Sequence, residues 1–315
     1  LDDTLTFLEP TAVPSSLTWT AIDGGESHTC GLTQDGAIYC WGTGYPTGQA
    51  GDGTQVAEEP TLVTAGPWTA LTSGTDHVCA TMGDGTGSCW GVGEFGQLGG
   101  GAPDTTVTPT AITGTPSWAD LTAGHFHTCG VTPTGEAYCW GRGADGQIGN
   151  GEVEDQGSPA PVAGGNSWTR ISAGRFHTCG ISTEGDAFCW GEGGWGQLGN
   201  GSPADQTSPV KVSGGREWTD IAAGWFHSCG VDASGKLYCW GRGDGFIGLG
   251  GFGSATPAVV LPAYTWQAVR TQGLHTCAIR DNFETYCWGP NGFGQLGIGD
   301  TDDSRVPRIL VRGVL

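Results

Sequence analysis

The chain has 315 residues, of which 60 are glycine, 14 tryptophan and 12 cysteine, and its formal net charge is −20. Each glycine costs about 1 kcal/mol inside a helix relative to alanine, so this composition favours strands and turns, while the tryptophan and cysteine content excludes a disordered chain. The acidity, with no basic run, argues against a nucleic-acid partner, and the absence of any run of 18 apolar residues argues against membrane insertion.

The fifth repeat illustrates the order of the predicted strands along the chain. A Pro-x-x-Val segment (Pro209–Val212) comes first, followed by W-T-D-I-A-A-G (Trp218–Gly224), H-S-C-G-V (His227–Val231) and L-Y-C-W-G (Leu237–Gly241). Polar and apolar residues alternate within these runs, which predicts strands, and Gly, Asp and Ser clusters between them predict turns. The pattern recurs every 48–50 residues, so each repeat is predicted to be one propeller blade of four antiparallel strands.

The repeats form a single all-β domain that spans residues 1–315. They are assigned approximately to residues 10–54, 60–101, 109–151, 159–201, 209–251 and 257–299, with 300–315 as a closing strand. Both ends carry the leading segment of a blade, Pro10 to Val13 and Pro307 to Val311. We therefore expect a β-propeller of six blades, with seven as the alternative, whose N- and C-terminal segments pair to close the ring.

Each repeat contains two cysteines ten residues apart. Pairing Cys129 with Cys139 leaves Pro133-Thr134-Gly135 as a three-residue hairpin loop, whose third position is left-handed and suits glycine. The sixth repeat has Asp281-Asn282-Phe283 instead, where we expect Asn282 to take the positive φ. Directly opposed Cβ atoms lie about 4.5–5.5 Å apart, close enough to reach disulfide geometry. The predicted disulfides are Cys30–Cys40, Cys79–Cys89, Cys129–Cys139, Cys179–Cys189, Cys229–Cys239 and Cys277–Cys287.

The cysteines also bear on metal binding and location. Zinc is the alternative to disulfides, but C-x-x-C pairs are absent and one Cys-His set per blade supplies too few ligands. Twelve cysteines that pair completely indicate an oxidising compartment. We therefore expect a secreted protein, extracellular or at the cell surface, with the periplasm as a further option. The start at Leu1 without a charged and apolar leader suits a mature secreted chain or a trimmed one.

The repeated pattern A-G-x-x-H-T-C-G-V followed by Y-C-W-G-x-G-x-x-G-Q-L-G-N-G resembles the regulator-of-chromosome-condensation repeat family over residues 18–315. The resemblance implies a β-propeller with blades of about fifty residues, and founding members have seven of them. Family members include nucleotide-exchange factors on chromatin, ubiquitin-ligase modules and a secreted bacterial inhibitor of β-lactamase, so the resemblance does not fix the function. The cysteine pairs and the acidity differ from nuclear members and disfavour a chromatin or GTPase role.

A histidine precedes the first cysteine of every repeat by two residues. These histidines are His28, His77, His127, His177, His227 and His275. A ring of imidazoles could bind a metal or carry protons, but a residue required in every copy is better explained by folding, since chemistry needs different groups that converge. We expect each ring to hydrogen-bond to backbone within its own blade.

The candidates for binding are the positions at which the repeats differ. Between the glycine and the repeated histidine, the third to fifth repeats carry His125-Phe126, Arg175-Phe176 and Trp225-Phe226. Equivalent loops of a propeller lie on one face, and aromatic residues with arginine favour binding, so these six residues form the predicted binding face. The alternative is that the phenylalanines only cap the inner strands. Secondary candidates, with packing inside each blade as their alternative, lie in the loops after C-W-G: Tyr45, Phe95, Trp195, Phe246 and Phe293.

These features predict a binding module for a protein or a glycan, acting as an inhibitor, an adhesin or a component of an extracellular assembly. One alternative is a structural subunit of an extracellular polymer that self-associates. Another is a hydrolase or lyase that degrades extracellular polymers, for which His125 with Arg175 is the nearest asymmetric polar pair. We predict no catalytic residue, because the sequence shows no nucleophile-elbow motif, no metal-ligand helix and no non-repeated pair of carboxylates beside a histidine outside the repeat pattern.

No metal or cofactor is predicted. Calcium requires six to eight oxygen ligands, whereas one late aspartate per repeat suits a turn that it stabilises by accepting backbone N–H groups. These aspartates are Asp104, Asp155, Asp205 and Asp302. If any site binds calcium, we expect it to be the cluster of Asp300, Asp302 and Asp303.

Overall fold

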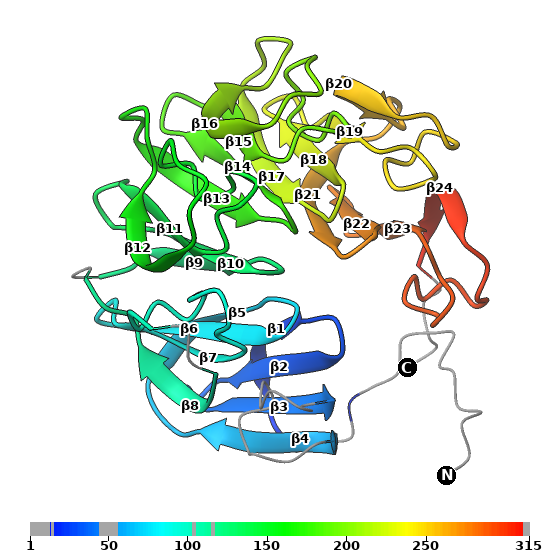
Figure 1. The fold of residues 1–315 in the computed structure, drawn as a ribbon. Coiled ribbons are helices and arrows are strands. Elements are labelled where there is room, and N and C mark those ends of the chain that lie inside the picture. The colour runs from blue at the N-terminus through cyan, green and yellow to red at the C-terminus, as the bar shows by residue number, and fades with distance from the viewer. Residues whose placement is uncertain (1–12, 14–15, 44–55, 103–104, 115–116, 311–315) are drawn as a thin grey trace.

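The computed structural model describes residues 13, 16–43, 56–102, 105–114 and 117–310. Within these residues every regular element is a strand, and the 24 strands form six sheets of four consecutive antiparallel strands each. Figure 1 shows the sheets following one another around a common centre, from the blue β1 to the red β24. The prediction of an all-β propeller with six four-stranded blades is confirmed.

The strands of the six blades have the following bounds. The first two blades contain β1 (Trp19–Gly24), β2 (His28–Thr33), β3 (Ile38–Thr43), β4 (Val56–Thr64), β5 (Trp68–Ser73), β6 (His77–Met82), β7 (Gly87–Gly91) and β8 (Thr106–Ala111). The next two contain β9 (Asp120–Ala123), β10 (His127–Val131), β11 (Ala137–Gly141), β12 (Gln156–Pro161), β13 (Trp168–Ala173), β14 (His177–Ser182), β15 (Ala187–Gly191) and β16 (Gln206–Lys211). The last two contain β17 (Trp218–Ala223), β18 (His227–Asp232), β19 (Leu237–Gly241), β20 (Ser254–Val260), β21 (Trp266–Gln272), β22 (His275–Arg280), β23 (Thr285–Gly289) and β24 (Ser304–Ile309).

The blades are out of phase with the repeats assigned from the sequence. The Pro-x-x-Val segment does not begin a blade but forms the fourth strand of the preceding one, as Val210 of β16 does opposite Cys189 of β15. The C-terminal segment is β24 and completes the sixth blade. Residues 10–12 lie outside the described part of the chain, and so does the predicted pairing of the two terminal segments.

The hairpin between the second and third strands of each blade holds a disulfide. Cys129 pairs directly with Cys139 in the register of β10 and β11, with Cα atoms 4.0 Å apart, and Gly135 has a φ of +85°. All six predicted disulfides are present. The sixth hairpin differs from our expectation, because Phe283 and not Asn282 takes the positive φ, at 67°. The loop requires a left-handed residue at its third position, whichever residue occupies it.

The hydrophobic core consists of layers between neighbouring blades. In the layer between the fourth and fifth blades, Leu198 and Val212 of the fourth blade pack with Trp218 and Trp240 of the fifth. Four other layers combine two successive blades in the same way. Burial of a large side chain stabilises the folded state by roughly 1.5–3 kcal/mol, so each blade depends on its neighbour for its core.

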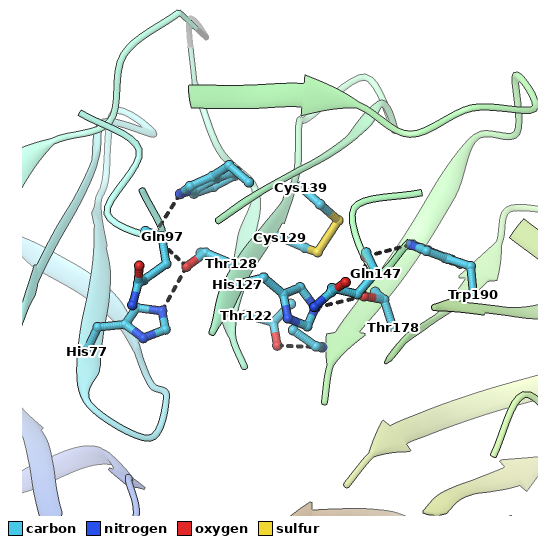
Figure 2. The surroundings of a disulfide bond; sticks show 12 residues. His77, Gln97, Thr122, His127, Thr128, Cys129, Cys139, Gln147, Thr178 and Trp190 are labelled. Atoms are coloured by element: carbon cyan, nitrogen blue, oxygen red, sulfur yellow. Dashed lines mark hydrogen bonds between the residues drawn. A yellow bond between two sulfur atoms is a disulfide. The ribbon is translucent and has the colours of Figure 1, made fainter. Parts of the chain in front are cut away.

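The repeated histidine links one blade to the next. His127 Nε2 lies 2.8 Å from Thr178 Oγ1 of the following blade, and that hydroxyl donates to the carbonyl of Gln147 (Figure 2). Since the hydroxyl proton points to the carbonyl, the hydroxyl accepts from Nε2–H. The indole N–H of Trp190 donates to the same carbonyl over 2.9 Å. Equivalent bonds join His77 to Thr128, His177 to Ser228 and His227 to Thr276. Our expectation of backbone partners within the same blade was therefore wrong.

The first boundary lacks this hydroxyl and offers a test. Val78 is buried at the position of Thr178, and neither ring nitrogen of the buried His28 has a hydrogen-bond partner among the described residues. We expect Val78→Thr to raise the free energy of unfolding by about 1 kcal/mol, because it supplies an acceptor for an unpaired buried donor. Urea midpoints measure the effect. Val131→Thr is the control, since Val131 packs in the apolar layer between the third and fourth blades. An equal loss of stability in both variants would contradict the prediction.

Candidate functional site

The predicted binding face occupies three adjacent loops at one end of the ring. We call its six residues the crescent: His125, Phe126, Arg175, Phe176, Trp225 and Phe226. All six side chains are partly exposed. Backbone hydrogen bonds hold the loops in order, because His125 N–H donates to the Gly174 carbonyl and Arg175 N–H to the Gly224 carbonyl. The structure thus brings together all six predicted residues.

The glycine before each crescent pair allows this close approach. A Cβ atom on Gly174 would lie 2.5 Å from the carbonyl oxygen of Gly224, and one on Gly124 would lie 2.4 Å from that of Gly174. Any side chain there would separate the blades at the centre of the ring, which we call the hub. The repeated A-G of the sequence therefore sets the spacing of the crescent.

Arg175 lies at the centre of the crescent, among aromatic rings. Its Cζ is 4.4 Å from the ring centroid of Trp225, 4.8 Å from that of Phe176 and 5.6 Å from that of Phe226. Burial lowers the pKa of this guanidinium, which remains charged at neutral pH. Among the described residues no carboxylate lies within ion-pair distance of Arg175, and its buried Nε has no hydrogen-bond partner. The rings thus hold a cation that makes no salt bridge within the described part of the chain, although the negative charges of Glu26 and Glu192 act on it from a greater distance.

Two further arginines flank the crescent, and our sequence reasoning missed them. Arg142 lies 5.0 Å from the ring centroid of Phe176, and Arg242 lies 5.5 Å from that of Phe226. Unlike Arg175, both are paired with acids, Arg142 with Asp145 and Arg242 with Asp244. The signal was available, because the residue after C-W-G differs among the repeats. In order it is Thr43, Val92, Arg142, Glu192, Arg242 and Pro290.

The predicted secondary candidates differ in their surroundings. Phe95 and Trp195 join the crescent, with ring centroids 5.4 Å from Phe126 and 6.3 Å from Phe226 respectively. Phe246 is buried, and its ring centroid lies 6.1 Å from that of His227, so at this residue the structure favours packing over binding. Phe293 is exposed on the sixth blade, and Tyr45 lies outside the described residues. Phe95 of the second blade and Trp195 of the fourth thus extend the crescent into one surface that spans the second to fifth blades.

His125 is held as a neutral ring. Burial, assisted by the positive charges of Arg175 and Arg142, lowers its pKa to about 3. Its Nδ1 is hydrogen-bonded to the hydroxyl of Thr75, and its ring centroid lies 5.4 Å from that of Trp225. The ring therefore contributes an uncharged, partly apolar surface beside Arg175.

The comparison with known sequences follows the repeats observed in the fold. A sequence profile of the regulator of chromosome condensation (RCC1) repeat matches residues 89–131, 134–181, 184–231 and 284–312. A second profile of this repeat matches residues 19–45, 118–147, 168–197 and 218–245, so that together they cover more than half of the chain. The chain belongs to the RCC1 repeat family. No curated protein gives a significant match to the sequence of this RCC1-repeat chain.

Solved structures share the RCC1-repeat fold at low sequence identity. Human WBSCR16 is 22% identical, with a TM-score of 0.87 over 96% of this chain and 85% of its own. Prp20p from Saccharomyces cerevisiae, described with its binding properties to Gsp1p and histones, is 21% identical, with a TM-score of 0.81 over 93% and 76%. The ectodomain of the Physcomitrella patens receptor kinase CR4 is 23% identical, with a TM-score of 0.60 over 88% and 63%. These likenesses show the fold alone.

The inner strands of the RCC1-repeat ring carry a polar cluster that we did not predict. A cavity of about 340 Å³ there is lined by Asp23, Asp120, Asp220, Arg170 and Arg270, among others. Asp220 is buried and lies 2.9 Å from each arginine. Asp23 accepts the N–H of Ser73 in the next blade, and burial raises the pKa of its carboxyl. These groups tie inner strands of different blades together, which is a structural role.

Late aspartates of three RCC1 repeats stabilise turns, while Asp104 lies outside the described residues. Asp155 accepts the N–H of Gly143 over 2.8 Å, and Asp205 and Asp303 do the same for Gly193 and Asn291. In the sixth repeat Asp303 thus takes the role that we assigned to Asp302. Asp300 is paired with Arg308 at 2.9 Å. Within the described part of the chain, no group of three His, Cys, Asp or Glu side chains is placed to hold a metal ion, and no helix could span a membrane.

Proposed function

We propose that this RCC1-repeat propeller is a protein-binding module that holds an acidic side chain of its partner on the crescent. The observation that carries the proposal is Arg175, a cation held by three aromatic rings and without a salt bridge among the described residues. A guanidinium whose faces are covered by rings keeps the N–H groups at its edge for a carboxylate.

The surroundings of Arg175 support a protein partner. Aromatic residues with arginine are enriched among the side chains that dominate protein–protein interfaces. The rings of Phe126 and Phe176 stack 5.9 Å apart, and Trp195 is exposed beside Phe226. This apolar floor around Arg175 matches a partner segment that combines an acidic residue with apolar neighbours.

We further propose that the protein acts outside the cytoplasm. Six disulfides, with ten of their twelve cysteines wholly shielded from solvent, support an oxidising compartment. The ectodomain of a receptor kinase shares the fold.

Arg175→Gln tests the crescent. We expect the variant to bind the partner about tenfold or more weakly, because a hydrogen bond to a charged group contributes roughly 1.5–3 kcal/mol, while its melting temperature stays within about 2 °C. Affinity capture from the native extracellular milieu, followed by titration of the purified partner, measures the effect. The matched control is Arg216→Gln, since Arg216 also stacks on a ring, that of Tyr238 at 4.3 Å. Capture of the same proteins at equal affinity by both variants would contradict the proposal.

A further inference from the structure

The boundary between the sixth and first blades, which we call the seam, is built unlike the other five. At each of the five, a backbone N–H of one loop donates to a backbone carbonyl of the next blade, as Arg175 does to Gly224. At the seam, the side chain of Gln272 donates to the carbonyl of Gly24 over 2.7 Å. Gln272 occupies the position of the hub glycines such as Gly174. A side chain fits at this position because the first blade lies farther from the sixth than other successive blades lie from each other at the hub.

The sixth blade carries the histidine and the glutamine carbonyl that, in other blades, hydrogen-bond to the next blade. At the boundary after the fourth blade, the hydroxyl of Ser228 bonds to His177 and to the carbonyl of Gln197. At the seam, no hydrogen bond from the described residues reaches the ring of His275 or the carbonyl of Gln295.

The apolar part of this sixth-blade face is uncovered as well. Ile279 is 38% exposed, whereas Ile181, at the same position of the fourth blade, is 3% exposed. The sixth hydrophobic cluster, around Leu296, contains residues of the sixth blade alone.

The first blade presents the complementary donor face. Thr29 lies opposite Trp41 in the register of β2 and β3, as Thr128 lies opposite Trp140 in the third blade. Trp41 is partly exposed, whereas its five counterparts are fully buried. Ile22 is 51% exposed, and the equivalent hub residues of the last four blades are buried. Both walls of the seam are therefore apolar faces of the kind that other blades cover.

The shape of the seam limits what can enter it. At the hub the two walls are one glutamine side chain apart, so an additional inner strand has no room there. A cavity of about 430 Å³ lies at the crescent end, lined by Trp225, Leu274, His275 and Phe293, among others. A second copy of the chain cannot place its first blade against the sixth blade in this way, because its remaining blades would overlap those of the first copy. The space suits two strands that enter from the rim.

We propose that the seam binds a β-hairpin of a partner protein, and that this hairpin presents a threonine or serine opposite a tryptophan. The chain itself uses this cross-strand pair at its intact boundaries, where Thr128 bonds to His77 and to the carbonyl of Gln97 (Figure 2). The indole of Trp140, which lies opposite Thr128, donates to the same carbonyl. A hairpin that makes these bonds to His275 and Gln295 also covers Ile279. The seam adjoins the crescent at Trp225, but the hydrogen-bonding groups and the apolar face used here belong to the sixth blade, so this inference does not rest on the proposed function.

A peptide copied from the chain tests the proposal. The probe is residues 127–141, closed by the Cys129–Cys139 disulfide, labelled with a fluorophore and titrated with the intact protein by anisotropy. We expect saturable binding that weakens about tenfold or more in Ile279→Asp, because a charge would be buried against the hairpin. The matched control is Val259→Asp, at a residue that is 39% exposed on the outer strand β20. A probe with Trp140→Phe should also bind less tightly, since it loses the indole N–H.

Three outcomes would overturn the proposal. The first is no saturable binding of the probe at millimolar concentration, and the second is equal weakening by Ile279→Asp and Val259→Asp. The third is self-association of the protein that Ile279→Asp abolishes, which would place a second copy on the seam. Loss of probe binding in Arg175→Gln but not in Ile279→Asp would show that the peptide binds the crescent and not the seam. The experiment therefore distinguishes an error in the seam proposal from an error in the proposed function.

Discussion

Acidification from pH 7 to pH 5 is expected to lower the free energy of unfolding by several kcal/mol. Burial lowers the pKa of His77, His127, His177 and His227 to about 3, and that of His28 to about 4. Each of the first four donates Nε2–H to a hydroxyl, and their Nδ1 atoms, which a second proton would occupy, have no acceptor within the described residues.

The sign and size of this pH effect follow from linkage. The folded pKa lies below the unfolded value of about 6.5, so the unfolded chain takes up more protons and stability falls as the pH drops from about 6.5 towards 3. At pH 5 each ring contributes roughly 2 kcal/mol to this loss. The carboxyl groups of Asp23, Asp76, Asp120 and Glu192, whose pKa values burial raises, act in the opposite direction and offset part of this loss.

Urea unfolding at pH 7, 6 and 5 with the disulfides intact measures the effect. His177→Gln is the control variant, because an amide N–H can still donate to Ser228 while the ring that titrates is gone. The His177→Gln variant should take up about one proton fewer on unfolding in this pH range than the parent protein does. Equal stability at pH 7 and pH 5 would show that the buried rings do not titrate as described.

Reduction of the disulfides is expected to abolish folding, and the sixth should open first. Each closes a ten-residue separation in the unfolded chain, which contributes roughly 2–3 kcal/mol, and six together contribute roughly 12–18 kcal/mol. That sum is comparable to the whole stability of an ordinary domain, about 5–15 kcal/mol. Cys277 is partly exposed because it lines the seam, whereas the ten cysteines of the other five disulfides are wholly shielded from solvent.

Alkylation of the folded protein at increasing reductant concentration, followed by mass spectrometry, gives the order of opening. The internal control is Cys229–Cys239, which has the same position in the fifth blade and is covered by the sixth. Opening of this disulfide before or together with Cys277–Cys287 would contradict the prediction, and so would refolding of the fully reduced chain in the absence of oxidant.

The sequence was sufficient to predict what repeats inside a blade. The ten-residue spacing between Cys129 and Cys139 determined the hairpin register and thereby the disulfides. The contacts between blades were harder to predict, because a pattern within one repeat does not show which group of the next repeat it meets. For this reason the partner of His127 was misassigned. The phase of the blades was missed for a related reason, since Pro209–Val212 is adjacent in sequence to the blade that follows it.

The candidate site was predictable in part. The non-repeated residues His125, Arg175 and Trp225 were recognisable because they interrupt a strict pattern. The stacking of Arg142 on Phe176 was not, because the two residues come from loops of different blades and meet only when these pack side by side. Comparison of all variable positions, including the one after C-W-G, would have found this arginine.

The sharing of each hydrophobic layer between two blades has a consequence for how the molecule opens. A blade inside the array has a neighbour on both sides, whereas the first and the sixth have only one across a complete layer. In a linear array with nearest-neighbour coupling, the terminal units fray at the lowest free energy. Native-state fluctuations should therefore begin at the two blades that flank Gln272, and the third and fourth blades should be the most persistent part of the molecule.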